Sequence, residues 1–352
     1  MSLTVLSVAY PLAPVSPDAA GGAEQILSML EGAIVEAGHR SVVVAQEGSQ
    51  IAGTLVPVPA PAGDLDAAAT GRAQEATRAA IGAALAGYAV DFVHMHGIDF
   101  HAYLPPPGLP VLATLHLPLS WYPAEALQPT RPDTWLHCVS DGQHAACAQG
   151  LRLLAPIPNG IDVEALQARH AKRSYAMFLG RICPEKGVHL ALDAAQAAGV
   201  PLLVAGEVFP YGAHQRYFDE EVRPRLDAWR RFIGPIGFSR KRRLLTGACC
   251  LLIPSLVPET SSLVAREAAA CGTPVIAFPN GALSEAVEHG RTGFLVDGVE
   301  SMASAIARAG EIDPETCRST ARRRFSKARM TGAYLDLYAR LAAGSIAAQA
   351  SS

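Results

Sequence analysis

The chain repeats one pattern along most of its length, in which short apolar runs alternate with stretches of helical periodicity. In the first half the apolar runs predict strands at 4–9, 41–45, 92–95, 111–116 and 135–140. In the second half they predict strands at 175–179, 202–205, 250–253 and 275–277, with helices at 184–198, 239–248 and 262–271. Strands that alternate with helices favour an α/β fold built on doubly wound parallel sheets.

A length of 352 residues favours two domains, because a single hydrophobic core rarely grows beyond about 250–300 residues. The segment 156–162 is dense in turn-forming residues and is typical of a linker. We therefore predict an N-terminal Rossmann-like domain over 1–165 and a C-terminal one over 166–325. Ligands of such sheets bind at the carboxyl ends of the strands. A site for two substrates is then expected in a cleft between the domains.

The composition excludes several classes of protein. No apolar run reaches the 18 or so residues needed to span a bilayer, and no basic segment followed by an apolar one begins the chain, so we expect a cytoplasmic protein. The seven cysteines show neither a disulfide framework nor metal-ligand pairs and are predicted to be buried thiols. The basic clusters 240–243 and 322–324 lack interleaved aromatic residues, which favours solvated helix faces over a nucleic-acid site.

The net charge of −3 hides an uneven distribution of charge. Residues 1–165 carry 15 acidic and five basic side chains, whereas the remaining residues carry 17 acidic and 24 basic ones. A basic half suits an anionic ligand, and an acidic half disfavours anionic membranes and polyanionic partners. We expect the two halves to bind different ligands.

Two glutamates eight positions apart are the most informative functional feature. Glu259 lies in a predicted loop, and Glu267 lies inside a predicted helix whose N-cap would be Ser261 or Ser262. The unpaired N–H groups of the first helical turn would then lie between the carboxylates and could hold an anion. A nucleotide diphosphate sugar, with an anionic middle and hydroxyls at both ends, fits this arrangement. A capped helix with a solvated glutamate fits the same residues equally well.

Two cations are expected at a strand-to-helix junction in the second half. Arg181 and Lys186 share this junction and could neutralise a diphosphate in place of a divalent metal. An ordinary solvated pair of Glu185 with Lys186 is the alternative. Gly21 and Gly22 open the first predicted helix, where glycine lets backbone N–H groups approach a phosphate or sugar. Paired glycines are also common as simple helix starts.

His116 ends a predicted strand, at the edge where functional side chains of this fold cluster. It could hydrogen-bond a sugar hydroxyl or donate to developing charge, with a purely structural histidine as the alternative. Trp121 and Tyr122 follow it and could stack on a sugar or an aromatic acceptor, or belong to the core.

Two patterns indicate metal binding, and we favour another role for both. His94, His96 and His101 offer ring nitrogens, but the same segment supplies no acidic ligand other than Asp99. The Asp64-Leu65-Asp66 segment contains the D-x-D pair with which another class of sugar transferases binds metal. It lies between a proline-rich loop and an alanine-rich helix, so we predict an N-cap there.

A series of short motifs, in their order and spacing, resembles the retaining nucleotide-sugar glycosyltransferases of family four. The motifs are Gly21-Gly22-Ala23-Glu24, Pro158-Asn159-Gly160-Ile161-Asp162, Gly180-Arg181 with Glu185-Lys186-Gly187, Gly206-Glu207, Gly234, Pro258-Glu259 with Glu267-Ala268, Cys271 to Ala277 and Gly290 to Val296. Together they span almost the whole chain. The resemblance implies the GT-B fold, with two Rossmann-like domains facing a cleft and the donor held mainly by the second. It also implies a final helix, here within 326–345, that crosses back onto the first domain.

The resemblance further implies a role for individual residues. Glu267 would accept hydrogen bonds from the ribose hydroxyls, and Glu259 would contact the hydroxyls of the donor sugar. Arg181 and Lys186 would hold the diphosphate, assisted by the first-turn amides near Ser262 and Leu263. The full set of implied donor contacts is Gly22, Gly180, Arg181, Lys186, Gly234, Ile236, Glu259, Ser261, Ser262, Leu263 and Glu267. The residues with an implied catalytic role are His116, Arg181, Lys186 and Glu259.

Two positions depart from the pattern of that family. Thr260-Ser261-Ser262 stands where members often show Pro-Phe-Gly, and Leu117 follows His116 where aspartate is frequent. The two serine hydroxyls could cap the helix or touch phosphate. The donor pocket is therefore expected to differ from that of other members.

We predict a retaining, metal-independent glycosyltransferase that moves a sugar from a nucleotide diphosphate donor to an acceptor hydroxyl, without a cofactor. A UDP-sugar is the expected donor, with a GDP- or ADP-sugar as the alternative, and the acceptor would be a sugar, a small metabolite or a natural product. A sugar-nucleotide epimerase of the same architecture and a non-catalytic sugar-nucleotide binding protein are the alternative functions.

Overall fold

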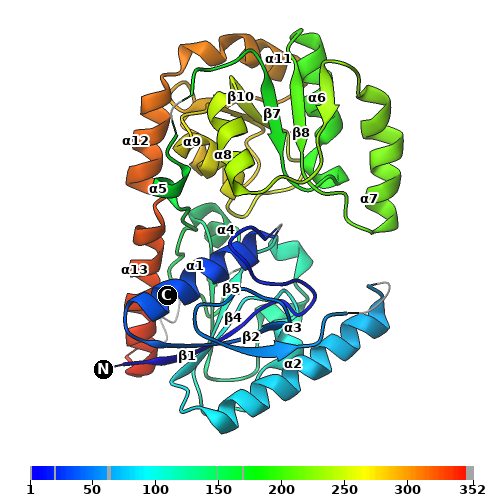
Figure 1. Cartoon of the computed structure of the whole chain (residues 1–352). Coiled ribbons are helices and arrows are strands. Elements are labelled where there is room, and N and C mark those ends of the chain that lie inside the picture. The colour runs from blue at the N-terminus through cyan, green and yellow to red at the C-terminus, as the bar shows by residue number, and fades with distance from the viewer. Residues whose placement is uncertain (1, 20, 62–64, 149, 169, 346–352) are drawn as a thin grey trace. The chain divides into compact units, whose positions relative to one another are not determined.

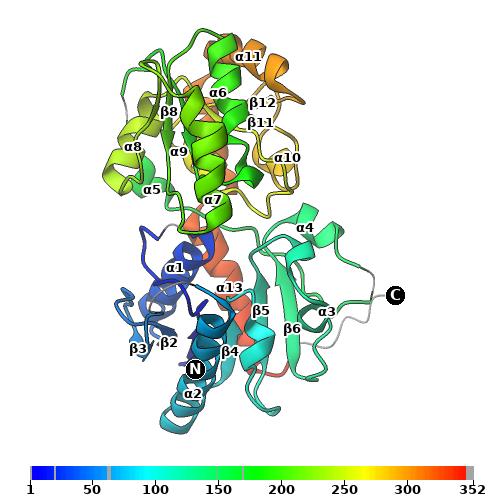
Figure 2. The ribbon, with the colours of Figure 1, turned by 90° about the vertical axis from the view of Figure 1, so that its right-hand side faces the viewer.

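The computed structural model describes residues 2–19, 21–61, 65–148, 150–168 and 170–345, which form two compact units (Figures 1 and 2). Unit 1 contains Met1–Asn159 and Ala328–Ser352, and unit 2 contains Gly160–Lys327. The chain thus enters unit 2 after residue 159, whereas the sequence predicted residue 165. The earlier boundary follows from burial, because Ile161, Val163 and Leu166 belong to the hydrophobic core of unit 2.

Unit 1 contains a six-stranded sheet in the order β3-β2-β1-β4-β5-β6, and all neighbouring strands are parallel. Its strands are β1 (Thr4–Val8), β2 (Arg40–Gln46), β3 (Thr54–Val58), β4 (Phe92–Met95), β5 (Val111–Leu115) and β6 (Thr134–Cys138). The central strands are buried on both faces, which explains their continuous apolar runs. The strand order reverses between β1 and β4, so the switch point of this sheet lies there.

Unit 2 repeats the same topology, in the order β12-β11-β10-β7-β8-β9, again with parallel neighbours. Its strands are β7 (Ala176–Leu179), β8 (Leu202–Ala205), β9 (Arg230–Phe232), β10 (Cys250–Ile253), β11 (Val275–Ala277) and β12 (Gly293–Leu295). Its switch point lies between β7 and β10, where ligands of this fold bind. The predicted α/β fold with two doubly wound parallel sheets is confirmed.

Helices separate the strands in both units. Those of unit 1 are α1 (Gly22–Glu36), α2 (Ala67–Gly87), α3 (Ala124–Leu127), α4 (Asp141–Ala145) and α13 (Lys327–Ala342), which begins at the last residue of unit 2, with short 3₁₀ turns at Phe100–Tyr103 and Leu119–Trp121. Those of unit 2 are α5 (Val163–Leu166), α6 (Val188–Ala197), α7 (Gly212–Tyr217), α8 (Phe238–Gly247), α9 (Leu263–Ala270), α10 (Leu283–Ala286), α11 (Val299–Arg308) and α12 (Pro314–Arg324). Unit 2 also has a π turn at Phe218–Val222 and 3₁₀ turns at Pro184–Lys186, Arg223–Arg225 and Ala309–Glu311.

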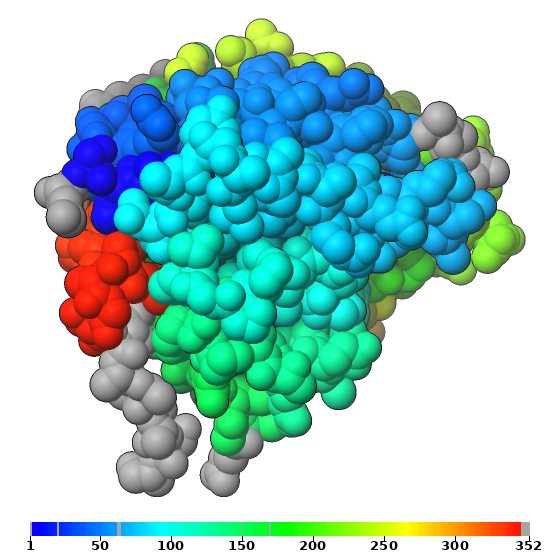
Figure 3. Space-filling model, turned by 90° about the horizontal axis from the view of Figure 1, so that it is seen from below, coloured from blue at the N-terminus to red at the C-terminus, as the bar shows by residue number. Residues whose placement is uncertain are grey.

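The sheet of unit 1 is covered on both faces (Figure 2). Helix α2 packs against one face through Ile81. Helices α1 and α13 cover the other, where Leu27 of α1 packs beside Val43 and Tyr338 of α13 contacts His94 of β4. Figure 3 shows α13 at the surface beside the N-terminal residues of the chain. The last helix is therefore part of the core of unit 1.

The strands that the sequence did not predict are β3, β9 and β12, and each lies at the edge of its sheet. Strand β3 contains Pro57, which an edge strand tolerates because its outer N–H groups make no ladder bonds. Strand β9 begins with two arginines, and β12 has only three residues. A strand that is paired on one side needs little apolar sequence, so these segments lacked the signal of the central strands.

Two predictions concern helix ends. Asp66 is the N-cap of α2 and accepts a hydrogen bond from the N–H of Ala69 at 2.7 Å, as predicted, while Asp64 lies outside the described residues. The final helix covers Lys327–Ala342, within the expected range 326–345, and Phe325 ends α12 with its side chain in the core of unit 2.

The fold also shows how the cysteines are buried and whether a described helix could span a membrane. All seven cysteines are free, and five of them are buried while Cys147 and Cys249 are half-buried. None of the described helices combines the length and the apolar character that a membrane span requires.

We expect Gly206→Ala to lower the free energy of unfolding by roughly 3 kcal/mol. Gly206 follows β8 with a φ of 150°, and an added Cβ would lie 1.8 Å from the carbonyl oxygen of Gly180. The control Gly310→Ala meets no atom within 4 Å and should change stability by less than about 0.5 kcal/mol. Urea unfolding of the full chain measures both variants, and equal midpoints would contradict the close approach of these two loops.

Candidate functional site

The loop after β7 positions two cations at the switch point of unit 2. It contains Arg181 and Lys186, and the 3₁₀ turn Pro184–Lys186 ends at Gly187, which has a φ of 63°. A Cβ on Gly187 would lie 2.2 Å from the carbonyl oxygen of Pro254, at the end of β10. The missing side chain therefore lets the loops after β7 and β10 approach closely, and this brings Lys186 to the loop after β10.

Lys186 forms a largely buried ion pair with Glu259, whose Oε1 lies 2.5 Å from the Lys186 Nζ. The hydroxyl of Ser255 donates to the same carboxylate. Burial alone would raise the pKa of Glu259, but the charge of Lys186, these hydrogen bonds and the charge of Arg181 together hold it below its ordinary value. Glu259 is therefore ionised at neutral pH and is held in one position.

A second buried ion pair connects α8 to α9. The Nζ of Lys241 lies 2.6 Å from Oε1 of Glu267, and both side chains are mostly buried. The sequence placed Lys241 in a solvated basic cluster, and that interpretation is wrong for this residue. Helical periodicity carries Lys241 to the inner side of α8, where only a carboxylate partner compensates its burial.

The start of α9 has an unusual backbone and two unsatisfied hydroxyls. Ser262 has φ 54° and ψ 73°, and it is the one non-glycine residue with positive φ in the described part of the chain. Such a conformation costs of order 1 kcal/mol or more for a residue with a Cβ. The hydroxyls of Ser261 and Ser262 are buried and make no hydrogen bond within the described structure. Ser262 is the N-cap residue of α9, as predicted, but its hydroxyl makes no capping hydrogen bond.

These features together make a site suited to an anion with hydroxyl groups on either side. The N-terminus of α9 carries a partial positive charge and free N–H groups. Ser261 and Ser262 add two donors at that terminus, and the loop after β7 adds two cations. The two ion-paired carboxylates are acceptors, Glu259 in the loop before α9 and Glu267 within α9. Leu263 is the first residue of α9 and packs against the core of unit 2.

Three glycines line the carboxyl ends of β7, β8 and β9. The N–H of Gly180 donates to Ala205 at 3.1 Å, and the N–H of Gly206 donates to the carbonyl of Gly234 at 3.0 Å. Ile236 follows Gly234 and is half-buried against the core. The sequence-predicted residues of unit 2 thus all lie in loops at this edge of the sheet or at the start of α9, and their contacts with a donor stay predictions.

Gly22 and His116 belong to unit 1. Gly22 is the first residue of α1 and is exposed. His116 is buried, and its Nε2 lies 3.0 Å from Nδ1 of His96. Burial, with the nearby His137, lowers the pKa of His116 to about 3. A neutral imidazole donates one hydrogen bond and accepts one, so we expect His116 to act as a neutral hydrogen-bonding group rather than as an imidazolium acid.

His116 belongs to a network of four buried histidines. His94 bridges the Tyr338 hydroxyl and the Thr114 hydroxyl, each at 2.7 Å, and Thr114 contacts His137 at 2.7 Å. The rings of His94 and His96 lie 3.9 Å apart. Hydrogen bonds within the core engage at least one ring nitrogen of each of these histidines, whereas Nε2 of His96 is buried without a partner in the described structure. Our preference against a metal at His94 and His96 stays a prediction. Tyr122 is buried in the core as well, whereas Trp121 is exposed.

Sequence reasoning missed Ser255 and Lys241. Ser255 lies two residues after the end of β10, and its place at the carboxyl edge of a parallel strand could have identified it. No local signal singles out Lys241 from the neighbouring basic residues. Its role depends on which side of α8 faces Glu267.

Residues 173–311 match the model of the family described as glycosyl transferases group 1. The match lies within unit 2. The matched residues include both cations of the β7 loop, both ion-paired glutamates and the serines at the start of α9. The features assembled above therefore lie within the part of the chain that matches the family model.

Comparisons with individual proteins extend the match over the whole fold. An alignment of 154 residues, covering 41% of this chain, is 36% identical to the glycogen synthase of Mycobacterium tuberculosis. The chain spans 36% of the length of that relative in this match. The crystal structure of AviGT4, a glycosyltransferase involved in avilamycin A biosynthesis, matches 97% of this chain and 98% of its own, with a TM-score of 0.74 and 27% identity. The structure of Anabaena HepE in complex with UDP and glucose matches 96% and 99% of the two chains, with a TM-score of 0.74 and 18% identity. The fold is therefore that of GT-B glycosyltransferase structures.

The buried histidines predict a loss of stability in acid. Burial lowers the pKa of His137 to about 4, so below pH 6.5 the unfolded chain binds a proton that the folded chain does not. The free energy of unfolding should therefore fall between pH 7.5 and pH 5, by about 2 kcal/mol for His137 alone. We expect His137→Gln to reduce this fall by that amount in urea titrations at both pH values. An unchanged pH dependence would contradict the neutral state of His137.

The two unsatisfied serines predict an unusual response to mutation. Ser261→Ala should leave the free energy of unfolding unchanged or raise it, because it removes a buried hydroxyl without a partner. The matched control Ser255→Ala removes a hydrogen bond to a carboxylate and should cost about 1.5–3 kcal/mol. Urea unfolding of both variants without ligand makes the comparison. An equal loss in both would show that the Ser261 hydroxyl has a partner in the free protein.

Proposed function

We propose that the chain is a retaining, metal-independent glycosyltransferase that moves a sugar from a UDP-sugar to an acceptor hydroxyl. One observation carries this proposal. At the switch point of unit 2, two buried Lys–Glu ion pairs accompany a helix N-terminus whose two buried serine hydroxyls have no partner. An anion at this terminus would satisfy those hydroxyls and compensate the strain at Ser262. The match to the group 1 family model and the complex of HepE with UDP and glucose support a nucleotide sugar as the ligand.

The proposed donor would place its diphosphate between the cations and α9. Lys186 uses one of its three donors on Glu259 and keeps two for phosphate oxygens. The ionised carboxylate of Glu259 would accept hydrogen bonds from hydroxyls of the transferred sugar. Glu267, held by Lys241, would accept from the ribose hydroxyls. The ion pairs thus fix the two acceptors as well as neutralising their charge.

The proposed chemistry is stabilisation of a leaving group. The bond from the anomeric carbon to the phosphate oxygen breaks, and negative charge builds on the diphosphate beside Arg181, Lys186 and the dipole of α9. The acceptor oxygen forms its bond on the same face, and its proton passes to the departing phosphate. His116, being neutral, would act only as a hydrogen-bond partner of the sugar. These groups are preorganised before the donor binds, which is the condition for electrostatic catalysis.

The test combines donor binding with turnover. Calorimetry with UDP-, GDP- and ADP-glucose identifies the donor, and release of nucleoside diphosphate is then followed with and without a panel of hydroxyl acceptors after treatment with EDTA. We expect acceptor-dependent release of UDP that survives the chelator. Binding without turnover against any acceptor would overturn the enzymatic proposal, and loss of turnover with EDTA that Mg²⁺ restores would overturn metal independence.

Variants separate the roles within the same assay. Arg181→Ala should slow transfer on the order of 10²-fold with folding intact, because the charge on the leaving group loses a cation. Glu267→Gln should weaken donor binding about tenfold or more, since a neutral amide is a poorer acceptor for ribose hydroxyls. Arg291→Ala, at an exposed ion pair with Glu288, is the matched control and should change neither quantity. Unchanged donor affinity in Glu267→Gln would reject the ribose assignment.

A further inference from the structure

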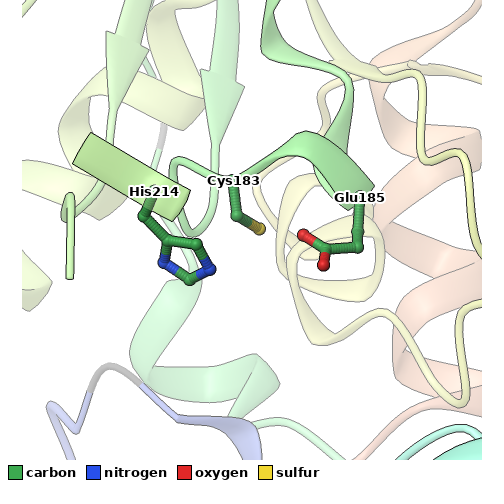
Figure 4. Close-up of side chains that lie close together, drawn as sticks. All are labelled: Cys183, Glu185 and His214. Carbon is green, nitrogen blue, oxygen red and sulfur yellow. The ribbon is translucent and has the colours of Figure 1, made fainter. Parts of the chain in front are cut away.

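Three side chains in and beside the loop after β7 have no part in the proposed reaction. Cys183, Glu185 and His214 each offer one ligand atom, and the three atoms lie within 4.8 Å of one another. Figure 4 shows Cys183 between the other two, with its thiol directed toward the Glu185 carboxylate and the His214 ring below it. A thiol, an imidazole and a carboxylate together are a donor set of the kind that zinc sites use.

The backbone holds the three residues in place. Cys183 is buried directly after Ile182, whose N–H donates to Glu207 at 2.9 Å. The carbonyl of Glu185 accepts from the N–H of Leu256 at 2.8 Å, so its position is tied to the loop after β10. His214 lies on α7, and Tyr211 packs edge-on against its ring. Two backbone hydrogen bonds and one ring contact therefore hold the three residues at one point of unit 2.

The His214 ring presents Nε2 to Cys183 and Glu185, and Nδ1 lies on the far side of the ring (Figure 4). A cation held by the three side chains would therefore bind Nε2. The Nδ1 is buried and makes no hydrogen bond within the described structure. Burial of the ring lowers the pKa of His214, with Arg181 acting in the same direction and Glu185 opposing it, so the imidazole is neutral and able to ligate.

We propose that Cys183, Glu185 and His214 form a zinc-binding site, with a fourth coordination position left for water or an anionic oxygen. Zinc–ligand distances of about 2.0–2.3 Å place the ligand atoms of a tetrahedral site roughly 3.3–3.8 Å apart. Because the three ligand atoms lie within 4.8 Å of one another, the site would contract by about 1.5 Å at most, through rotation of the Glu185 and His214 side chains. Zinc binding releases the thiol proton of Cys183 to solvent.

A reactive thiol is the other chemistry that this group could have. Burial, with the adjacent Glu185 and against the opposing charges of Arg181 and Lys186, raises the pKa of Cys183 to about 11. The thiol is therefore protonated at neutral pH without a metal and is a poor nucleophile. Metal coordination is the chemistry that uses all three groups.

Zinc at this point would act on the loop that carries both candidate cations. Cys183 and Glu185 lie between Arg181 and Lys186 in the sequence, so two coordination bonds would restrain the loop directly. Zinc binding requires neither the sugar donor nor turnover. The zinc proposal can therefore hold or fail independently of the proposed transferase reaction, which is tested in the presence of a chelator.

The experiment uses the full chain, stripped with a chelator and then titrated with Zn²⁺ alone in competition with a chromophoric chelator. We expect one zinc per chain and a loss of affinity of at least about 100-fold in Cys183→Ser and in His214→Gln. The matched control Cys147→Ser removes a half-buried thiol outside the group and should bind as the wild type does. Because His214 is half-exposed on a short helix, His214→Gln carries the test if Cys183→Ser does not fold.

Cobalt substitution identifies the ligand directly. Co²⁺ in the wild type and in Cys147→Ser should produce a thiolate-to-metal charge-transfer band, and the band should be absent in Cys183→Ser. The absence of stoichiometric zinc binding in the wild type would overturn the proposal. So would equal affinity in the wild type and His214→Gln, which would show adventitious binding at other side chains.

Discussion

The ion pair between Lys186 and Glu259 is the interaction on which the arrangement of unit 2 depends. It joins the loop after β7 to the loop after β10 at the point where the strand order reverses. Two charges that are mostly removed from water are tolerated only because they neutralise each other, and removal of one partner from such a pair typically costs 3–5 kcal/mol. The pair also has close backbone support, since Gly187 allows its loop to reach Pro254. The same contact therefore holds two loops together and presents a cation and a carboxylate at the place where this topology binds ligands.

The start of α9 shows the opposite balance between stability and binding. Ser262 keeps a left-handed backbone that a glycine would adopt more readily, and two buried hydroxyls are left without partners. Residues with these features lower the stability of the free protein, and they persist where the surrounding structure over-determines them. Around them α9 is well anchored, through Glu267 and Lys241 and through an apolar face in the core. The well-anchored helix thus offsets the stability lost at its N-terminus through Ser262 and the two unpartnered hydroxyls. This arrangement is expected of a preorganised anion site.

Unit 1 has the same strand order as unit 2, but different side chains fill its interior at the carboxyl edge of the sheet. His94 lies in β4, at the switch point, and His96 directly follows that strand. These histidines can be buried because each stays neutral and hydrogen-bonds to Thr114, Tyr338 or another ring. The Tyr338 and Tyr334 side chains come from α13, at the end of the chain. The last helix therefore completes the core of the unit in which the chain begins. A shared topology has been filled with apolar side chains and ion pairs in one unit and with neutral polar rings in the other.

The sequence by itself determined the elements whose own residues carry the physical signal. Buried parallel strands such as β5 and β10 must be apolar on both faces, and Asp66 can cap a helix through a contact three residues away, so their patterns are local. The sequence also identified Glu259 and Glu267 as candidate ligand contacts, because a predicted loop and a predicted helix place both of them near a helix N-terminus. Only the tertiary structure decided how these groups are paired. Edge strands needed neighbours to form, Lys241 needed the packing of α8 on α9 to find Glu267, and Cys183 needed α7 to bring His214 beside it. These contacts join residues that are distant along the chain, and their energy depends on burial and orientation, which no local pattern encodes.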